Sequence, residues 1–104
     1  MVDYELNELK REFLDEAREK VVEMETAAES FREQTAIDRL AYLAHQLKGS
    51  GGSYGYQRIS TEAAELEKLV ESIAEGTTST DDGERIRQYV VNLRVEIDRA
   101  AAEL

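Results

Sequence analysis

The chain has 104 residues, a single histidine, no cysteine, proline or tryptophan, and a formal net charge of −10 at pH 7. Its length suits one domain with a single core, spanning residues 1–104. Disulfides and thiolate sites are excluded, and so much negative charge argues against a nucleic-acid or anionic-membrane surface. Neither an apolar run of membrane-spanning length nor a signal peptide is present, so we expect a cytoplasmic protein.

The N-terminal segment, residues 3–30, reads as a helix in a chain whose composition favours an all-α fold. Apolar residues recur there at three- and four-residue spacing, at Leu6, Leu9, Phe13, Ala17, Val21, Met24 and Ala28. Asn7 is a candidate break that would create a short extra N-terminal helix before a longer one beginning near Lys10. The sequence leaves both arrangements open.

A second helix is predicted from residue 36 to about Tyr54 or Tyr56, with Thr35 as its N-cap and Asp38 completing a capping-box-like pair. The glycines leave its register beyond Ser50 open. Its apolar stripe consists of Ala36, Ile37, Leu40, Leu43, Ala44, Leu47, Gly51 and Tyr54. The opposite face carries the only histidine, His45, which is therefore expected to point away from the core.

Two further helices complete the chain. Their predicted apolar stripes are Ile59, Ala63, Leu66, Leu69, Val70 and Ile73 in the third, and Ile86, Tyr89, Val90, Leu93, Ile97, Ala100, Ala101 and Leu104 in the last. Ser60 or Thr61 is expected to cap the third, which stops at Gly76, where a glycine suits a left-handed C-cap. A loop over 76–83 follows, and Asp81 or Asp82 can cap a last amphipathic helix from Glu84. Four amphipathic helices with short connections predict an up-down-up-down four-helix bundle.

Glycines are concentrated just after His45, where four of the six lie. Each costs about 1 kcal/mol relative to alanine inside a helix, so their presence requires a reason. Gly51 faces the predicted core and can let a neighbouring helix approach closely. Gly49 and Gly52 face outward, where packing gives no such reason, so we interpret them as clearance for a large partner that reaches His45.

The run from Ala44 to Gly49, Ala-His-Gln-Leu-Lys-Gly, followed by Gly52 and Gly55, resembles the signature of histidine-containing phosphotransfer (HPt) domains. The likeness in length and helix order extends over essentially all 104 residues. The resemblance implies that His45 carries a phosphoryl group on Nε2 and that Lys48 helps to hold it. It also implies that Gly49 and Gly52 admit a receiver domain.

The same resemblance implies a phosphorelay role in two-component signal transduction. The domain would accept the phosphoryl group from the phospho-aspartate of a receiver domain, in a response regulator or hybrid histidine kinase, and pass it to another. The receiver would supply Mg²⁺ and the acidic pocket, so the chain itself would need neither a metal nor an ATP site. It would act as a monomeric phosphoryl carrier, a phosphoprotein whose catalysis the partner completes.

Other side chains near His45 are candidates for contact with the phosphate or the partner. Gln46 can hydrogen-bond either one. Ala41, Tyr42 and Tyr56 share the outward face and offer a docking surface, since aromatic residues are frequent in interface cores. Phe13 or Leu14 of the first helix is expected to extend this patch.

Two other functions are compatible with a histidine on a helical bundle. The dimerisation and phosphoacceptor region of sensor kinases is disfavoured, because Gln46 follows the histidine instead of an acidic residue and the chain has no proline. A non-catalytic docking adaptor for receiver domains is the main alternative. The dinucleotide-binding pattern G-x-G-x-x-G, read from Gly49, fails because position 54 is tyrosine, and the P-loop pattern fails because this stretch has no Gly-Lys pair. A nucleotide-binding glycine loop is therefore excluded. Met1 and the capped start favour a stand-alone protein.

Overall fold

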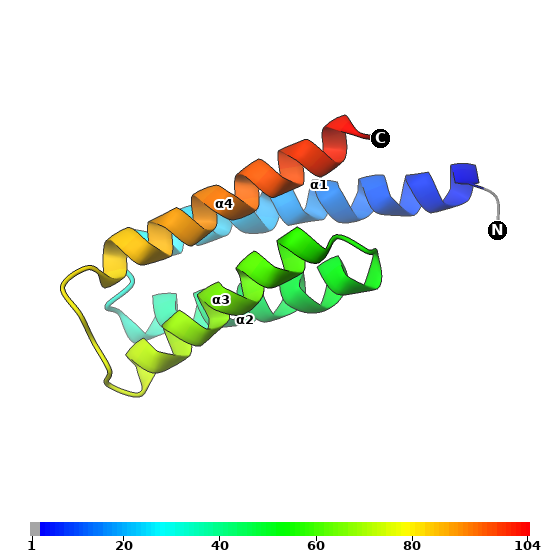
Figure 1. Ribbon diagram of the computed structural model, residues 1–104. Coiled ribbons are helices and arrows are strands. Elements are labelled where there is room, and N and C mark those ends of the chain that lie inside the picture. The colour runs from blue at the N-terminus through cyan, green and yellow to red at the C-terminus, as the bar shows by residue number, and fades with distance from the viewer. Residues whose placement is uncertain (1–2) are drawn as a thin grey trace.

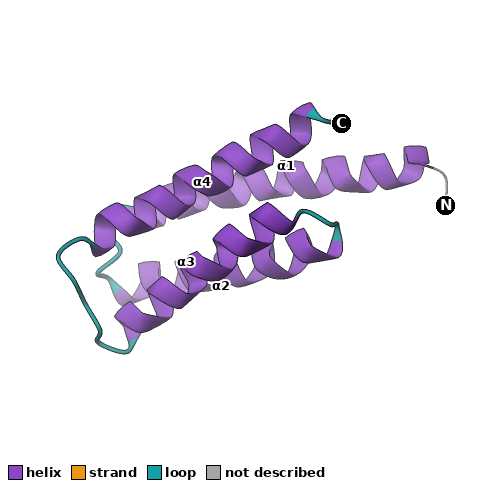
Figure 2. Ribbon diagram, viewed as in Figure 1, coloured by secondary structure: helices purple, strands orange, loops and turns teal. Residues whose placement is uncertain are grey.

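The computed structural model describes residues 3–104, which form four α-helices and, within that range, no strand. The helices are α1 (Asp3–Ala28), α2 (Gln34–Ser53), α3 (Gln57–Ala74) and α4 (Asp82–Ala102). Each packs against the helices before and after it, and α4 closes the ring against α1 (Figure 1). Short connections reverse the chain three times (Figure 2), which confirms the predicted all-α, up-down-up-down four-helix bundle.

The core is built from the apolar stripes that the sequence predicts for α2, α3 and α4. Those of α2 and α3 are buried at Ala36, Ile37, Leu40, Leu43, Ala44, Leu47 and Gly51, and at Ile59, Ala63, Leu66, Leu69, Val70 and Ile73. The α4 stripe is buried at Ile86, Val90, Leu93, Ile97 and Ala100. Four predicted stripe members are only partly buried: Tyr54 of the α2 stripe and Tyr89, Ala101 and Leu104 of the α4 stripe. Because the buried side chains all point inward, the opposite faces of the helices remain available to solvent.

Helix α1 runs without interruption from Asp3 to Ala28, so the proposed short extra N-terminal helix is wrong. Its stripe is buried from Phe13 onward, whereas Leu6 and Leu9 are 37% and 39% exposed. The first turns of α1 extend past the ends of α2 and α4 (Figure 1), which agrees with the partial exposure of both leucines.

The helix starts differ from those predicted. Helix α2 begins at Gln34 after Glu33, which makes no side-chain cap hydrogen bond, so the Thr35–Asp38 capping pair is wrong. Helix α3 begins at Gln57, before the expected cap at Ser60 or Thr61. The Ser60 hydroxyl instead donates to the backbone carbonyl of Lys48 at 2.8 Å, which ties α3 to α2.

The start of α4 also uses its acidic residues in an unexpected way. Asp81 occupies the N-cap position without a side-chain cap hydrogen bond. The buried carboxylate of Asp82 reaches back and accepts the backbone N–H of Ser79 at 2.8 Å. The bond satisfies a backbone donor in the loop just before the helix.

Helix α2 ends at Ser53 with Tyr54 as its C-cap, so of the two predicted ends, Tyr54 and Tyr56, the structure agrees with the earlier one to within one residue. Gly55 takes a φ of +82°, and the backbone N–H groups of Gly55 and Tyr56 donate to the carbonyls of Gly52 and Gly51. These two bonds form a Schellman motif, in which a glycine adopts the left-handed conformation at low cost. Gly76 ends α3 in the same way, with a φ of +96°, as predicted.

The α2–α3 pair packs closely at Gly51. A Cβ atom placed there would lie 3.3 Å from both Ile59 Cγ2 and the Ser60 backbone nitrogen. The glycine therefore permits the close approach of α3 that its position on the core face predicted.

Within residues 3–104, no helix combines the length and apolar character that a membrane crossing requires.

Candidate functional site

His45 lies near the middle of α2 and faces solvent, as the helical pattern predicted. Its side chain is 68% exposed, whereas the adjacent Ala44 and the nearby Leu47 are buried. The histidine therefore makes no contribution to the core that would account for its presence.

One edge of the imidazole ring is held by a residue of α3. His45 Nδ1 lies 2.8 Å from Glu67 Oε2. A carboxylate can only accept a hydrogen bond, so Nδ1 carries the proton. In the neutral ring this places the lone pair on Nε2, the nitrogen that Glu67 leaves uncontacted.

The same carboxylate also binds the lysine of the sequence motif. Lys48 Nζ lies 2.6 Å from Glu67 Oε1, so one carboxylate bridges the two motif side chains of α2. The Glu67 side chain is only 12% exposed, whereas that of Lys48 is 39% exposed. Glu67 is thus a largely buried anion with a charge-assisted hydrogen bond on one oxygen and an imidazole on the other.

The environment of Glu67 keeps it ionised. Burial alone would raise the pKa of this carboxyl group, but hydrogen bonds and charge interactions with Lys48 and His45 outweigh burial and lower it below its ordinary value. The proton on His45 Nδ1 therefore faces a carboxylate throughout the neutral range.

This lowered pKa predicts an acid-dependent contribution to stability. A carboxyl group whose pKa is lower in the folded state stabilises the fold above its unfolded pKa, and that stabilisation is lost as the pH falls through the folded value. We expect wild type to exceed Glu67→Gln in unfolding free energy at pH 7 by about 1 kcal/mol or less, since Lys48 is partly solvated. Urea unfolding at pH 7 and pH 3 measures this. If wild type exceeds Glu67→Gln in unfolding free energy by the same amount at pH 7 and pH 3, the ionised Glu67 carboxylate does not contribute to stability as predicted.

An open groove lies beside His45, between α1 and α2. It is lined by Glu16 and Lys20 of α1, by His45, Gln46, Gly49, Ser50 and Ser53 of α2, and by Tyr54. Gly49 lies one turn after the histidine on α2 and lines the same groove. Among the described residues, no heavy atom beyond its own stretch of helix lies within 4 Å of where its Cβ would be. The missing side chain therefore leaves open space, as the interpretation of Gly49 as clearance requires.

Gly52 is less open, because its Cβ would lie 3.6 Å from Ser60 Oγ, an ordinary contact distance. Gln46 donates from Nε2 to Tyr42 Oη at 2.8 Å, and the guanidinium of Arg39 lies 5.4 Å from the centre of the Tyr42 ring. Tyr42 is exposed on the outer face of α2, and Ala41 is partly buried beside the core.

Tyr56 does not continue the His45 face, because α2 ends before it, and its expected position there is wrong. Its ring stacks on Phe13 with centroids 6.0 Å apart, and Tyr54 stacks on the same phenylalanine at 5.1 Å. Phe13 and Leu14 are both buried, so the expected extension of an exposed patch by either residue is also wrong.

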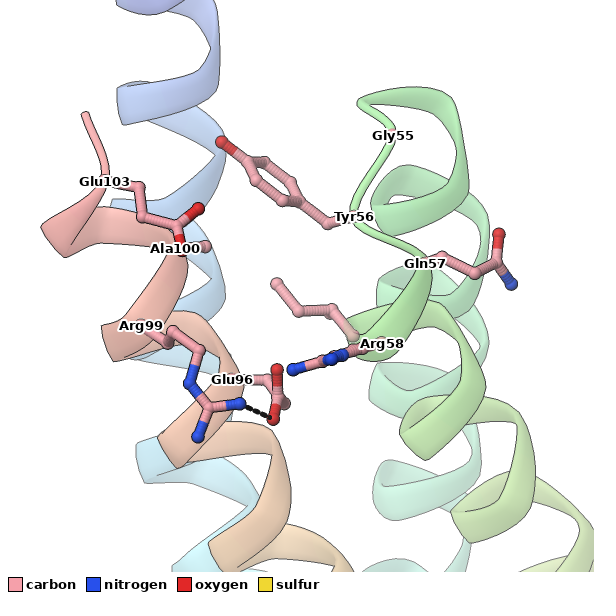
Figure 3. Close-up of a pocket in the computed structure, with 9 residues that line it drawn as sticks. Gly55, Tyr56, Gln57, Arg58, Glu96, Arg99, Ala100 and Glu103 are labelled. Atoms are coloured by element: carbon pink, nitrogen blue, oxygen red, sulfur yellow. Dashed lines mark hydrogen bonds and ion pairs between the residues drawn. The ribbon is translucent and has the colours of Figure 1, made fainter.

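Tyr56 instead lines a hollow at one end of the bundle, together with residues of α3 and α4 (Figure 3). Arg58 of α3 enters this hollow, and Arg99 of α4 pairs there with Glu96 at 2.8 Å. Burial, and then the nearby Glu103 carboxylate, raise the pKa of the Tyr56 hydroxyl. The hollow carries equal numbers of basic and acidic side chains and does not include His45.

Glu67 is the site residue that sequence reasoning missed. It is one of several glutamates in a charged helix, and nothing in its local spacing distinguishes it.

Over residues 3–104, no three His, Cys, Asp or Glu side chains are grouped so that they could hold a metal ion.

Comparison with known proteins agrees with the architecture and with the sequence motif. A family model described as the Hpt domain matches residues 8–103. Searches of curated proteins and of solved structures gave no match. Because the matched segment covers nearly all of the chain, from α1 to the end of α4, the protein belongs to the Hpt domain family, whose general role is histidine phosphotransfer in phosphorelays.

Proposed function

We propose that this domain is a phosphorelay intermediate, which accepts a phosphoryl group on His45 Nε2 from the phospho-aspartate of one receiver domain and passes it to another. The observation that carries the proposal is the contact between His45 Nδ1 and Glu67 on an otherwise exposed side chain. It gives the ring a fixed tautomer and leaves its nucleophilic nitrogen accessible.

The transfer step follows from this tautomer. The Nε2 lone pair forms the N–P bond as the P–O bond to the receiver's aspartate breaks, and the aspartate leaves as a carboxylate. The ring gains positive charge, which the Glu67 carboxylate balances across the Nδ1 proton. No proton has to leave the imidazole for the bond to form, and the reverse sequence returns the phosphoryl group to a second aspartate.

Lys48 serves two purposes in this proposal. Its hydrogen bond at 2.6 Å helps to keep Glu67 ionised, and hence the His45 ring oriented. Its charge, which Glu67 holds three residues from His45 on α2, would also attract the phosphoryl oxygens without touching them, an interaction of about 1–4 kcal/mol at a surface site. Gln46 lies next to His45 along the groove and can donate to the phosphoryl group if it releases Tyr42.

The partner completes the site. A receiver domain would bring its own Mg²⁺ and acidic pocket to the exposed face of α2. Gly49 and Gly52 leave space for its approach there, and Ala41 with Tyr42 gives it apolar area to cover. On this account the domain is a carrier whose catalytic groups are shared with the receiver.

The test is phosphoryl transfer from a panel of Mg²⁺-loaded, phosphorylated receiver domains to wild type and to His45→Gln. We expect label on the wild type alone, in a linkage that is labile to acid and stable to alkali. Label that persists in His45→Gln would contradict the proposal. If the folded wild type accepts phosphate from no receiver but still binds one, and His45→Ala binds equally well, a docking adaptor is the better description.

A further inference from the structure

The groove beside His45 has a second wall that belongs to α1 and carries a lysine. Lys20 lines this groove together with His45 and Gly49, whereas Glu67 and Lys48 do not line it. The two ring nitrogens of an imidazole lie on different edges, and Nδ1 is turned toward Glu67. The Nε2 edge therefore faces away from α3, on the side where the groove is open.

The two lysines near the histidine differ in what they already bind. Lys48 Nζ is held by Glu67 on the Nδ1 side of the ring. Lys20 is half-buried on α1, and among the described residues no carboxylate lies within ion-pair distance of its ammonium group. Glu16, one turn earlier on the same wall, does not pair with it. Lys20 is thus a positive charge without a protein counterion at the edge of the groove.

The absence of a side chain at Gly49 also bears on where a phosphoryl group on His45 would lie relative to Lys20. The glycine lines the same groove as His45 and Lys20, and among the described residues no atom beyond its own stretch of helix lies within 4 Å of where its Cβ would be. A phosphoryl group on Nε2 would occupy this space, because the Nδ1 side is closed by Glu67. A lysine side chain is long and flexible enough to bring its ammonium group over such a gap.

We propose that Lys20 is a second phosphate-binding cation, which contacts the phosphoryl oxygens on His45 Nε2 from α1 while Lys48 remains with Glu67. This inference rests on the proposed function. Lys20 neither gives nor takes a proton during the transfer. Its charge stabilises the group as the N–P bond forms and after the donor has left.

Glu16 allows a test of whether the charge of Lys20 is what acts on the phosphoryl group. It lies on the same wall, so its negative charge opposes the phosphoryl group that Lys20 attracts. Neutralising either residue changes the local charge by one unit, with opposite sign. A structural role for this wall would not produce opposite effects.

The experiment uses phosphoramidate, a small donor that needs no receiver: the Nε2–P bond forms as the donor's P–N bond breaks and ammonia leaves. We expect Lys20→Gln to slow the phosphorylation of His45 about fivefold and Glu16→Gln to speed it about twofold, with both effects reduced in 1 M salt. Lys20→Arg should restore most of the rate. Lys68→Gln, on the exposed side of α3, is the matched control and should leave the rate unchanged.

A direct readout is the NMR signal of each lysine Cε on phosphorylation of the wild type. The signal of Lys20 should shift, and that of Lys68 should not. Equal rates for Lys20→Gln and Lys68→Gln, with an unmoved Lys20 signal, would overturn the inference while His45 is still labelled. Absence of label on wild-type His45 from phosphoramidate and from every receiver would instead overturn the proposed function. Thermal melting of each variant excludes unfolding as the cause.

Discussion

Replacing Gly49 by leucine is expected to reduce phosphoryl transfer from receiver domains a hundredfold or more without destabilising the bundle. A Cβ added at this exposed position meets no atom within 4 Å among the described residues beyond its own stretch of helix, so we expect the fold to tolerate the longer side chain. Leucine also has a higher helix propensity than glycine, which should raise the unfolding free energy by about 0.5–1 kcal/mol. The same side chain occupies the space beside His45 that a receiver would need, so docking is lost while stability increases.

The measurement pairs urea unfolding with transfer from a phosphorylated receiver. Ala102→Leu is the matched control, because it adds a leucine at an exposed position near the end of α4, a helix that does not contact α2. Gly49→Ala should be intermediate in transfer. Labelling of Gly49→Leu by phosphoramidate should fall far less than transfer from receivers, since that donor is small. Unimpaired transfer to a folded Gly49→Leu variant would show that partners do not approach over this position.

Glu67→Gln is expected to slow transfer about ten- to a hundredfold while leaving the helices intact. Glutamine has nearly the same shape as glutamate, but it lacks the charge that balances the ring as the N–P bond forms. Its amide can also donate to Nδ1, which favours the tautomer with the proton on Nε2 and removes the nucleophilic lone pair.

Transfer kinetics should be measured together with the ¹⁵N shifts of the His45 ring, which report the tautomer. In the wild type we expect the proton on Nδ1, and in Glu67→Gln a shift toward Nε2. Glu71→Gln removes a carboxylate one turn further along α3 and should change neither quantity. A Glu67→Gln variant that transfers at the wild-type rate would show that the contact of 2.8 Å with His45 has no part in the reaction.

The fold was predictable because burial follows helical periodicity. The stripes of α2, α3 and α4 are buried as their spacing predicts. The helix starts were less predictable, because Glu33 and Tyr56 occupy N-cap positions without side-chain cap hydrogen bonds. The exposed leucines at the start of α1 show a further limit: periodicity indicates which face is apolar, but the lengths of the neighbouring helices decide how much of it is covered.

The site was predictable only where it lies on one helix. His45, Lys48 and Gly49 share one stretch of α2, so helix geometry gave their common neighbourhood, and the resemblance of the motif to the HPt signature gave their roles. Glu67 lies 22 residues from His45 in the chain, and its contact depends on how α3 is positioned along α2. That position is set by contacts such as the approach of Ile59 to Gly51, which no local pattern reveals. Tyr56 was misplaced because a helical wheel has no meaning beyond the left-handed turn at Gly55.

The outward position of His45 also has a thermodynamic consequence. Its ring makes its hydrogen bond to the rest of the protein through Nδ1, and a group added at Nε2 would enter the open groove without displacing a buried side chain. We therefore expect the loaded and unloaded domains to have nearly the same shape and to store no conformational energy. The balance of phosphate between two receivers would then depend on the relative free energies of their own acyl phosphates, and the carrier would connect them reversibly in either direction.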